Sequence, residues 1–383
     1  MSKAIGERIE AGLPPHDAPF SLAFSGGGDS LALLKYLRDN KRLKAVLHVD
    51  HGLREGSAKE ADRACELARF LGHSLTVLRW TPPRGKTGLQ EKARRARYGL
   101  MGDYCRAHDI GALITAHHAD DQAETVLMRV QRGSDWRGAA GIWPVRYAPV
   151  WPELAGVTLY RPALGISQSD LRAALGDMQP IQDPSNRNRN FARVRARQEL
   201  SNNSALSEDM LALSGDMMTG LRADRTRMQT QLDGYHLTHE GQFSIPCLVD
   251  AHALSLLAPI IGGQSGPASR AGMAEKREAL MSGKAVSIGN GCVGEWDGEI
   301  LTLSRDPVAI SGRKDRRVVP TAIPITITPD PVIWDGRFLV SGSAGQLHPE
   351  SRGLHVGFRV LYGRGVRVRN LVQERLEAAL MHQ

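Results

Sequence analysis

Several residue types are scarce in this 383-residue chain, and each scarcity argues against a class of protein. The four cysteines, Cys65, Cys105, Cys247 and Cys292, are far apart and form no Cys-x-x-Cys pair. This spacing argues against a disulfide scaffold or a zinc ribbon and fits a reducing cytoplasm. Aromatic residues make up only 5% of the chain, whereas glycine is plentiful, with 40 residues. That combination is typical of an α/β protein with many tight turns.

Long apolar runs are also missing. No stretch approaches the roughly 20 apolar residues of a membrane helix, and residues 1–15 carry charge throughout, unlike a signal peptide. We therefore expect a cytoplasmic protein that does not enter a membrane. The formal net charge of +8 and the pI of about 9.5 favour an anionic partner such as RNA or DNA. Many soluble proteins are mildly basic without such a partner, so the charge is a weak indication by itself.

The most informative stretch that is present is FSLAFSGGGDS, at residues 20–30. It begins as a short apolar strand, turns through glycines 26–28 and continues as a helix with an apolar pattern. Glycines let the backbone turn its N–H groups inward. Together with the hydroxyls of Ser25 and Ser30 and a helix N-terminus, these groups would hold phosphate. The same residues also fit an ordinary strand-to-helix turn in which Ser and Asp29 act as caps.

Strands and helices alternate through the first 130 residues. Further apolar strands are predicted at 43–50, 74–80 and 112–116, and helices at 57–71, 89–108 and 119–132. The alternation predicts an α/β fold with a doubly wound parallel sheet of about five strands. In such sheets ligands bind beyond the carboxyl ends of the strands, where the glycine turn lies.

The character of the chain changes near residue 200. Residues 205–235 are predicted as one long helix, residues 286–303 as a hairpin turned at Asp297-Gly298, and residues 333–341 as a further strand. We expect a catalytic domain over 1–200, a helical linker region over 201–255 and a smaller α+β region over 256–383.

Polar residues follow two of the predicted strands. HVDHGLR places His48, Asp50 and His51 at the end of the second strand, where they would line a nucleotide pocket or form a merely polar strand end. AHHADDQAET, at residues 116–125, opens a helix and contains adjacent histidines. A zinc site there is poorly supported, because the spacing is not His-Glu-x-x-His.

Three carboxylates in that helix start are a stronger indication. Asp120 and Asp121 each share a helical face with Glu124. Beside the phosphates of a nucleotide they would need a cation such as Mg²⁺, or they would bind the ammonium groups of a basic amino acid. Acidic capping of the helix explains one or two of the three.

Arginines gather in two further segments. EKARRARY, at residues 91–98, brings Arg94 and Arg97 to one side of a helix, although a solvated basic face explains that spacing as well. DPSNRNRNFARVRAR, at residues 183–197, contains five arginines. If residues 190–200 are helical, Arg193 and Arg197 share a face. Such clusters suit RNA phosphates, and a solvated charge run usually mixes signs more than this one does.

Together these motifs resemble those of the tRNA(Ile)-lysidine synthetase family, which has a PP-loop ATP-pyrophosphatase domain. The resemblance covers roughly residues 18–200 in order, through SGGGDS, HVDHGLR, EKARRARY, AHHADDQAET, RGSDWRG, RPAL and DPSNRNRNFARVRAR. Weaker similarities follow at 289–292 and 334–338. Three residues depart from the family pattern, namely Asp135, Ala163 and Gln182, and they bear on substrate handling more than on ATP cleavage.

The resemblance implies a C–N bond-forming ligase. Such an enzyme uses ATP and Mg²⁺ to join free lysine to the wobble cytidine of an isoleucine tRNA with a CAU anticodon. The cytidine is first adenylated and pyrophosphate leaves. The ε-amine of lysine then displaces AMP and gives lysidine. No covalent nucleophile is needed, so positioning and charge stabilisation should supply most of the catalysis.

Matching motif positions also implies site residues. Those expected to bind ATP are Ser25, Gly26, Gly27, Gly28, Asp29, Ser30, His48, Asp50 and His51. Those expected to be catalytic are Asp29, which would lie near Mg²⁺, and Asp120, Asp121 and Glu124. Those expected to bind lysine or tRNA are Arg94, Arg97, His117, Arg193, Arg195 and Arg197. The C-terminal half is expected to hold the tRNA stem through basic patches at 313–317 and 364–369, unless these are only solvated surface.

Three alternatives remain at the level of the sequence. A tRNA thiolase with the same nucleotide loop would need paired cysteines, and those present are isolated. An amidotransferase-linked ligase would need a glutaminase domain with a nucleophilic cysteine near one end, which we do not find. A non-catalytic tRNA-binding protein on the same scaffold is left possible by the altered residues, although the intact glycine turn argues against it.

Overall fold

A computed structural model describes most of the chain. The described residues are 3–15, 17–52, 56–82, 88–134, 136–182, 192–264, 272–306, 318–319, 325–327, 331–352, 355–364 and 366–380. Asp135, the first half of DPSNRNRNFARVRAR and the basic patch at 313–317 lie outside them. The chain divides into two compact units, each described separately below. Unit 1 comprises Met1–Pro149, Val157–Ala223 and Gln383, and unit 2 comprises Val150–Gly156 and Asp224–His382.

Unit 1 is built on a six-stranded sheet with the strand order β3-β2-β1-β4-β6-β5. Five strands are parallel: β1 (Phe20–Ala23), β2 (Leu43–Asp50), β3 (Leu75–Arg79), β4 (Ala112–Ile114) and β6 (Thr158–Tyr160). The sixth, β5 (Val145–Tyr147), pairs antiparallel with β6 at the edge. The predicted α/β sheet of about five parallel strands is therefore confirmed, with one additional edge strand.

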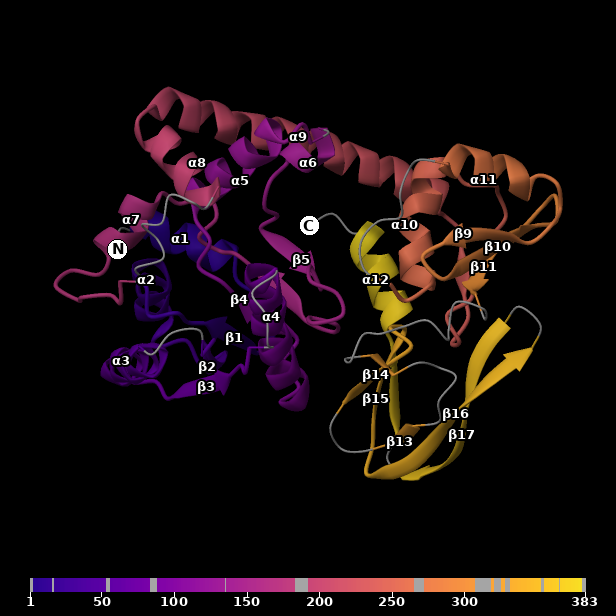
Figure 1. The fold of residues 1–383 in the computed structure, drawn as a ribbon, viewed down its shortest axis with the longest axis horizontal. Coiled ribbons are helices and arrows are strands. Elements are labelled where there is room, and N and C mark those ends of the chain that lie inside the picture. Colours follow the sequence, from indigo (N-terminus) through magenta and orange to yellow (C-terminus); the bar gives the residue numbers. More distant parts are fainter. Residues whose placement is uncertain are drawn as a thin grey trace. The chain divides into compact units, whose positions relative to one another are not determined.

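Helices surround the sheet of unit 1 (Figure 1), and apolar residues of both form its core. The helices are α1 (Lys3–Ala11), α2 (Gly28–Leu37), α3 (Ser57–Phe70), α4 (Leu89–Ala107), α5 (Ala119–Gln131), α6 (Trp136–Ala139), α7 (Gln168–Ala173) and α8 (Ala192–Ser201). Phe20 and Leu22 of β1 and Leu31 and Leu34 of α2 are fully buried in one cluster. Right-handed crossovers place α2 and α3 on one face of the sheet and α4 on the other. All of these connections bring the carboxyl ends of β1, β2 and β4 to one edge of the sheet.

The long predicted helix is present as α9 (Ser204–Gln231), which contributes residues to both units. Unit 2 continues with a sheet of order β7-β8-β11-β10-β9, covered by α10 (Ala251–Ile261) and α11 (Met273–Leu280). Its strands are β7 (His236–Leu237), β8 (Phe243–Ile245), β9 (Val286–Gly289), β10 (Cys292–Trp296) and β11 (Leu301–Arg305). The predicted turn at Asp297-Gly298 joins β10 to β11, and β9 is a third strand within the range predicted as a hairpin.

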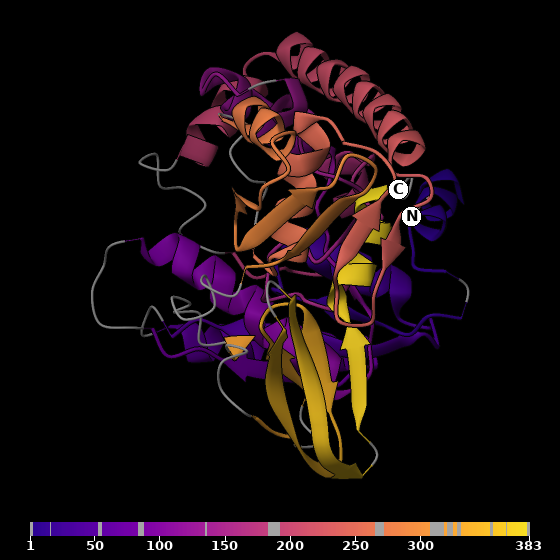
Figure 2. The same ribbon diagram turned by 90° about the vertical axis from the view of Figure 1, so that its right-hand side faces the viewer.

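Two smaller sheets and a last helix complete unit 2. One sheet has the order β12-β14-β15-β18 and the other β13-β16-β17, whose long hairpin is clear in Figure 2. The elements are β12 (Val318–Val319), β13 (Ile325–Ile327), β14 (Val332–Trp334), β15 (Phe338–Ser341), β16 (Ala344–Arg352), β17 (His355–Arg364), β18 (Arg367–Asn370) and α12 (Leu371–Leu380).

The single strand predicted over 333–341 is wrong, because the chain reverses at Asp335. This residue has a φ of 52° and separates β14 from β15, which pair antiparallel. Its carboxylate is fully buried and accepts hydrogen bonds from Arg305 Nε at 3.0 Å and Arg337 Nε at 2.7 Å. The two buried guanidiniums compensate the buried charge, so they hold the tight turn in place.

A segment that precedes β6 in the chain belongs to unit 2. Within Val150–Gly156, the Trp151 ring lies under the Arg375 guanidinium, 4.2 Å from its carbon, and Trp151 Nε1 donates to the Gly263 carbonyl at 3.4 Å. The sequence pattern did not indicate that residues 150–156 belong to unit 2. No helix among the described residues has the length and apolarity needed to cross a membrane.

Candidate active site

The glycine turn connects β1 to α2 in a conformation that requires glycine. Gly26 has a φ of +78°, and a Cβ atom there would lie 2.4 Å from Ile181 Cδ1. A Cβ on Gly28 would lie 2.8 Å from Arg172 Nε. Gly26 therefore requires glycine because of its backbone conformation, whereas a side chain at Gly28 would displace the Arg172 side chain. On the side that faces Arg172 and Ile181, the loop presents backbone atoms and no side chains of its own.

The serines of the loop hold it from within. Ser25 Oγ and Ser30 Oγ are 3.1 Å apart, and Ser30 Oγ also donates to the Gly27 carbonyl at 3.0 Å. Gly27 is the N-cap of α2, and no side chain caps it. Asp29 therefore does not cap α2, whereas Ser25 Oγ accepts from Gly27 N at 3.3 Å, as a serine in an ordinary strand-to-helix turn does. The N-terminal N–H groups of α2 remain directed at the loop, as anion binding requires.

Polar residues at the end of β2 adjoin this loop. His48 Nδ1 lies 2.9 Å from the carbonyl oxygen of Phe24, the residue before the loop, and burial lowers the pKa of His48. Asp50 accepts a hydrogen bond from Gly52 N at 3.0 Å. His51 meets the Trp80 ring edge-on, with centroids 5.9 Å apart. His48 therefore ties the end of β2 to the start of the phosphate-type loop.

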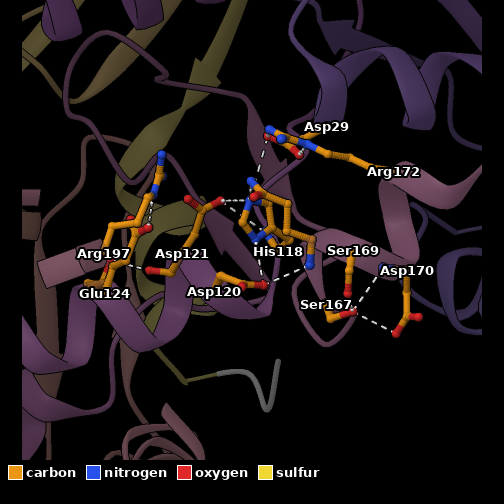
Figure 3. Close-up of polar contacts among 12 residues, drawn as sticks. Asp29, His118, Asp120, Asp121, Glu124, Ser167, Ser169, Asp170, Arg172 and Arg197 are labelled. Carbon is orange, nitrogen blue, oxygen red and sulfur yellow. Dashed lines mark hydrogen bonds and ion pairs between the residues drawn. The ribbon is translucent and has the colours of Figure 1, made fainter. Parts of the chain in front are cut away.

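His118, at the start of α5, joins the glycine loop to the carboxylates (Figure 3). Its Nε2 atom lies 3.7 Å from Asp29 Oδ2 and 3.5 Å from Asp121 Oδ2, and its Nδ1 atom lies 3.4 Å from Asp120 Oδ2. The side chain is only 1% exposed. A buried imidazole among three carboxylates is expected to be protonated.

The pKa values in this cluster are shifted accordingly. Burial lowers the pKa of His118, but hydrogen bonds to Asp120 and Asp29 outweigh burial and raise it to about 9. The hydrogen bond from His118 lowers the pKa of Asp120 to about 2 despite partial burial. Burial raises the pKa of Asp29, but His118 and Arg172 together lower it to about 2. Near neutral pH the cluster therefore contains an imidazolium among ionised carboxylates.

Helix α7 supplies two residues that the sequence did not indicate. Arg172 donates to both oxygens of Asp29, through Nε at 2.7 Å and Nη2 at 3.2 Å. The Gln168 backbone N–H donates to Asp120 Oδ2 at 2.8 Å. Ser167 caps α7, since its Oγ accepts a hydrogen bond from Asp170 N at 3.1 Å. Nothing in that local pattern signalled that α7 reaches back to the loop.

Helix α8 places two of the predicted arginines on the acids of α5. Arg193 bonds Asp121 through Nη2 and Glu124 through Nε, both at 2.6 Å, and Arg197 Nε bonds the other oxygen of Glu124 at 2.5 Å. Arg195 is exposed on the same helix. Asp121 also accepts from the His118 backbone N–H at 3.1 Å, so it caps α5 as well. Asp120 faces His118 and α7 instead, and does not join Glu124.

The remaining predicted residues lie in a basic cluster around Tyr98 and His117. Arg94 and Arg97 both lie over the buried Tyr98 ring, at 5.1 and 5.2 Å from its centroid. His117 Nδ1 lies 2.8 Å from Thr115 Oγ1, and burial together with the nearby Arg161 holds its pKa well below the usual value. Within the described part of the chain, no hydrogen bond or ion pair links these residues to Asp29 or His118.

The arrangement offers two kinds of chemistry at one sheet edge. The loop, the N-terminus of α2 and Arg172 provide positive potential suited to phosphate oxygens. The acids of α5 provide negative charge suited to an ammonium group or a cation. His118 lies between the two and contacts carboxylates of both.

Known proteins resemble this chain over most of its length. A PP-loop domain family matches residues 2–204. A tRNA(Ile)-lysidine synthase of Ruegeria pomeroyi is 33% identical over 340 residues, which cover 84% of this chain and 76% of the relative. One of Methylobacterium nodulans is 35% identical over 320 residues, which cover 77% of this chain and 91% of the relative. Among solved structures, a U34-tRNA thiolase of Methanococcus maripaludis covers 56% of this chain and 78% of its own at 14% identity, with a TM-score of 0.46. That last likeness is too weak to bear on function.

Proposed function

Since this chain belongs to the tRNA(Ile)-lysidine synthase family of PP-loop proteins, we propose that it ligates free lysine to the wobble cytidine of a CAU-anticodon isoleucine tRNA. ATP adenylates the cytidine, pyrophosphate leaves, and the ε-amine of lysine displaces AMP. One observation carries the proposal beyond family membership: His118 contacts both Asp29 of the glycine loop and the acids of α5. A phosphate-type site and an amine-type site thereby meet in one place.

The glycine loop is assigned to the phosphates of ATP. The backbone N–H groups at the start of α2 would bind phosphate oxygens, and the lack of a side chain at the half-buried Gly27 would allow close approach. His48, Asp50 and His51, at the end of β2, are assigned to the nucleoside side of the same pocket. Stabilisation of the leaving pyrophosphate by fixed donors is the largest contribution we expect to the first step.

The residues present are compatible with Mg²⁺ in one arrangement. Among the side chains that the structure describes, no three His, Cys, Asp or Glu residues form a metal site. Mg²⁺ is commonly held by one or two carboxylates together with substrate phosphates, and Asp29 is the carboxylate within the loop. Asp29 would hold the ion, which would neutralise charge on the phosphates.

The acids of α5 are assigned to lysine. Glu124 is 1% exposed and already bound by two arginines, whereas Asp120 and Asp121 retain 52% and 13% side-chain exposure. We therefore assign the α-ammonium group of lysine to Asp120 and Asp121, and its carboxylate to Arg193, which is 42% exposed, so that the ε-amine stays free to attack. Glu124 orients Arg193. Holding the amine near the adenylated carbon supplies the second step by proximity.

Lysine incorporation tests this function. Purified protein is incubated with ATP, Mg²⁺, radiolabelled lysine and CAU-anticodon tRNA, and label in the tRNA is counted. We expect incorporation that needs both ATP and this tRNA, and we expect Asp29→Ala to abolish it. Asp39→Ala is the matched control, because Asp39 also pairs with an arginine just beyond the other end of α2 but is 88% exposed. If the wild-type protein binds the tRNA but incorporates no lysine, it is a tRNA-binding protein and the proposed function is wrong.

A further inference from the structure

Arg172 occupies an unusual place against the glycine loop. It forms a two-pronged ion pair with Asp29, and its Nε atom lies only 2.8 Å from where a Cβ of Gly28 would be. The guanidinium therefore lies directly on the first turn of α2, at the positive end of the helix. Its side chain is nevertheless 46% exposed, so a ligand can reach it.

The segment that carries Arg172 is fastened to the loop and to α5 on both sides of α7. Ile181 N donates to the Gly26 carbonyl at 2.9 Å, and Lys35 Nζ of α2 donates to the Leu175 carbonyl at 3.2 Å. At the other end of α7, Gln168 N donates to Asp120 at 2.8 Å. These three hydrogen bonds hold the backbone of α7 in place, so the Arg172 backbone has a fixed position close to the loop.

A guanidinium at a helix N-terminus creates a strong preference for an anion. In the present structure that anion is the Asp29 carboxylate. Phosphate oxygens carry more charge than a carboxylate and match the planar donor fork of arginine equally well. A phosphate chain seated on the loop would compete for Arg172, and a cation beside the phosphates would compete for Asp29.

We propose that Arg172 is a phosphate-binding residue of this site, which exchanges the Asp29 carboxylate for the β- and γ-phosphate oxygens of the nucleotide and then for the leaving pyrophosphate. This inference rests on the proposed use of ATP. In the free protein the same ion pair keeps Asp29 and Arg172 neutral together. When Arg172 binds the phosphates, its ion pair with Asp29 breaks, so the Asp29 carboxylate becomes available at the same time.

A double-mutant cycle on pyrophosphate binding tests whether Arg172 binds phosphate or only forms a structural ion pair with Asp29. Inorganic pyrophosphate is titrated calorimetrically, without Mg²⁺, into the wild type, Arg172→Ala, Asp29→Asn and the double variant. In the Asp29→Asn background Arg172 is already released, so we expect Arg172→Ala to weaken binding by about tenfold to a hundredfold. In the wild-type background the loss is smaller, because there Arg172 must first leave Asp29. If Arg172→Ala changes the affinity less than about twofold in the Asp29→Asn background, Arg172 only forms a structural ion pair and the inference is overturned.

Four further measurements sharpen the result. Arg38→Ala is the matched control, since Arg38 caps the other end of α2, pairs with Asp39 and is 55% exposed; it should leave pyrophosphate binding unchanged. AMP lacks the β- and γ-phosphates, so its binding should depend on Arg172 by less than about threefold. Arg172→Lys should retain part of the affinity, and equal melting temperatures would exclude misfolding.

The outcomes also separate this inference from the proposed function. Pyrophosphate titration needs neither tRNA nor lysine. A wild-type protein that makes no lysidine but needs Arg172 for pyrophosphate binding supports the inference and refutes the function. A protein that makes lysidine with pyrophosphate binding indifferent to Arg172 refutes the inference alone.

Discussion

Arg193 of α8 bonds Glu124 of α5 through Nε at 2.6 Å. The sequence predicts that Arg193 binds lysine or tRNA and that Glu124 is catalytic. In the structure the two side chains form an ion pair with each other. Glu124 is 1% exposed, and Arg197 occupies its second oxygen. Ala196 and Leu200 of α8 pack on Ala123 and Leu127 of α5 beside these ion pairs. The pairs therefore anchor α8 on α5 and set the position from which Arg193 reaches Asp121.

Replacing both arginines should destabilise unit 1. Arg193→Ala with Arg197→Ala leaves the buried Glu124 carboxylate without its cations, at a cost of about 2–3 kcal/mol after allowing for the partial exposure of the arginines. Each single substitution should cost less, because one guanidinium remains. Urea denaturation measures the change. Arg195→Ala, exposed on the same helix, is the control and should stay within about 0.5 kcal/mol of the wild type. A double variant as stable as that control would show that the ion pairs do not stabilise the fold.

The same pairing changes what we expect of tRNA binding. Arg193 and Arg197 are paired with carboxylates of α5, and Arg195 is the most exposed of the three arginines. If α8 faces the tRNA, Arg195→Ala should reduce the slope of log K against log salt by about one, the value expected for one lost phosphate contact. Arg193→Ala and Arg197→Ala should reduce it less. Filter binding at several salt concentrations gives the slopes. A larger change from Arg193 or Arg197 than from Arg195 would place the tRNA on the opposite side of the helix.

The His118 cluster should make stability fall at alkaline pH. The pKa of His118 is raised from 6.5 to about 9, so the folded protein keeps this proton where the unfolded chain loses it. Its contribution is complete below pH 6.5 and disappears as the pH rises to about 9. We expect a loss on the order of 2 kcal/mol over that range, measured by denaturation without nucleotide or Mg²⁺.

His118→Gln is the control for this loss. The variant lacks the titrating group, so its stability should be lower at pH 6.5 and nearly flat to pH 9. The carboxylates behave in the opposite sense. With pKa values lowered to about 2, Asp29 and Asp120 contribute above pH 3.8, and that contribution is lost as the pH falls towards 2. A parallel alkaline loss in wild type and variant would assign it to other groups.

Local patterns predicted the parts of the fold that local physics determines. The apolar run of β2 and the glycine turn into α2 each depend on residues within a few positions of one another. Contacts between segments that are distant in the sequence could not be predicted from local patterns. Arg172 is 143 residues from Asp29, and its only local signature is one arginine in a short helix. Its role in the site depends on where β6 enters the sheet, beside β4, which no pattern within α7 encodes.

The predicted site shows the same division. The motif residues around 25–30 and 118–124 lie at one sheet edge, but the sequence did not indicate which of their charged side chains pair with one another. Three acids on one helix start suggest one shared site, yet Asp120 faces His118 whereas Glu124 faces Arg197. Likewise, the Trp-Asp-Gly sequence at 334–336 fits a strand until the two buried arginines that hold Asp335 in a turn are placed beside it.

Gly26 offers the most direct test of the loop geometry. Alanine at this position must adopt a φ of +78° and would place its Cβ 2.4 Å from Ile181 Cδ1. Strain and contact together should destabilise the protein by about 2–4 kcal/mol. Gly27→Ala is the matched control, because Gly27 has a φ of −69° and its nearest contact would be Ser25 Oγ at 3.3 Å. We expect that variant to lose less than about 1 kcal/mol. Combining Gly26→Ala with Ile181→Val removes the Cδ1 atom and should recover the contact part of the loss but not the backbone part. Equal stabilities of the two alanine variants in chemical denaturation would contradict this loop conformation.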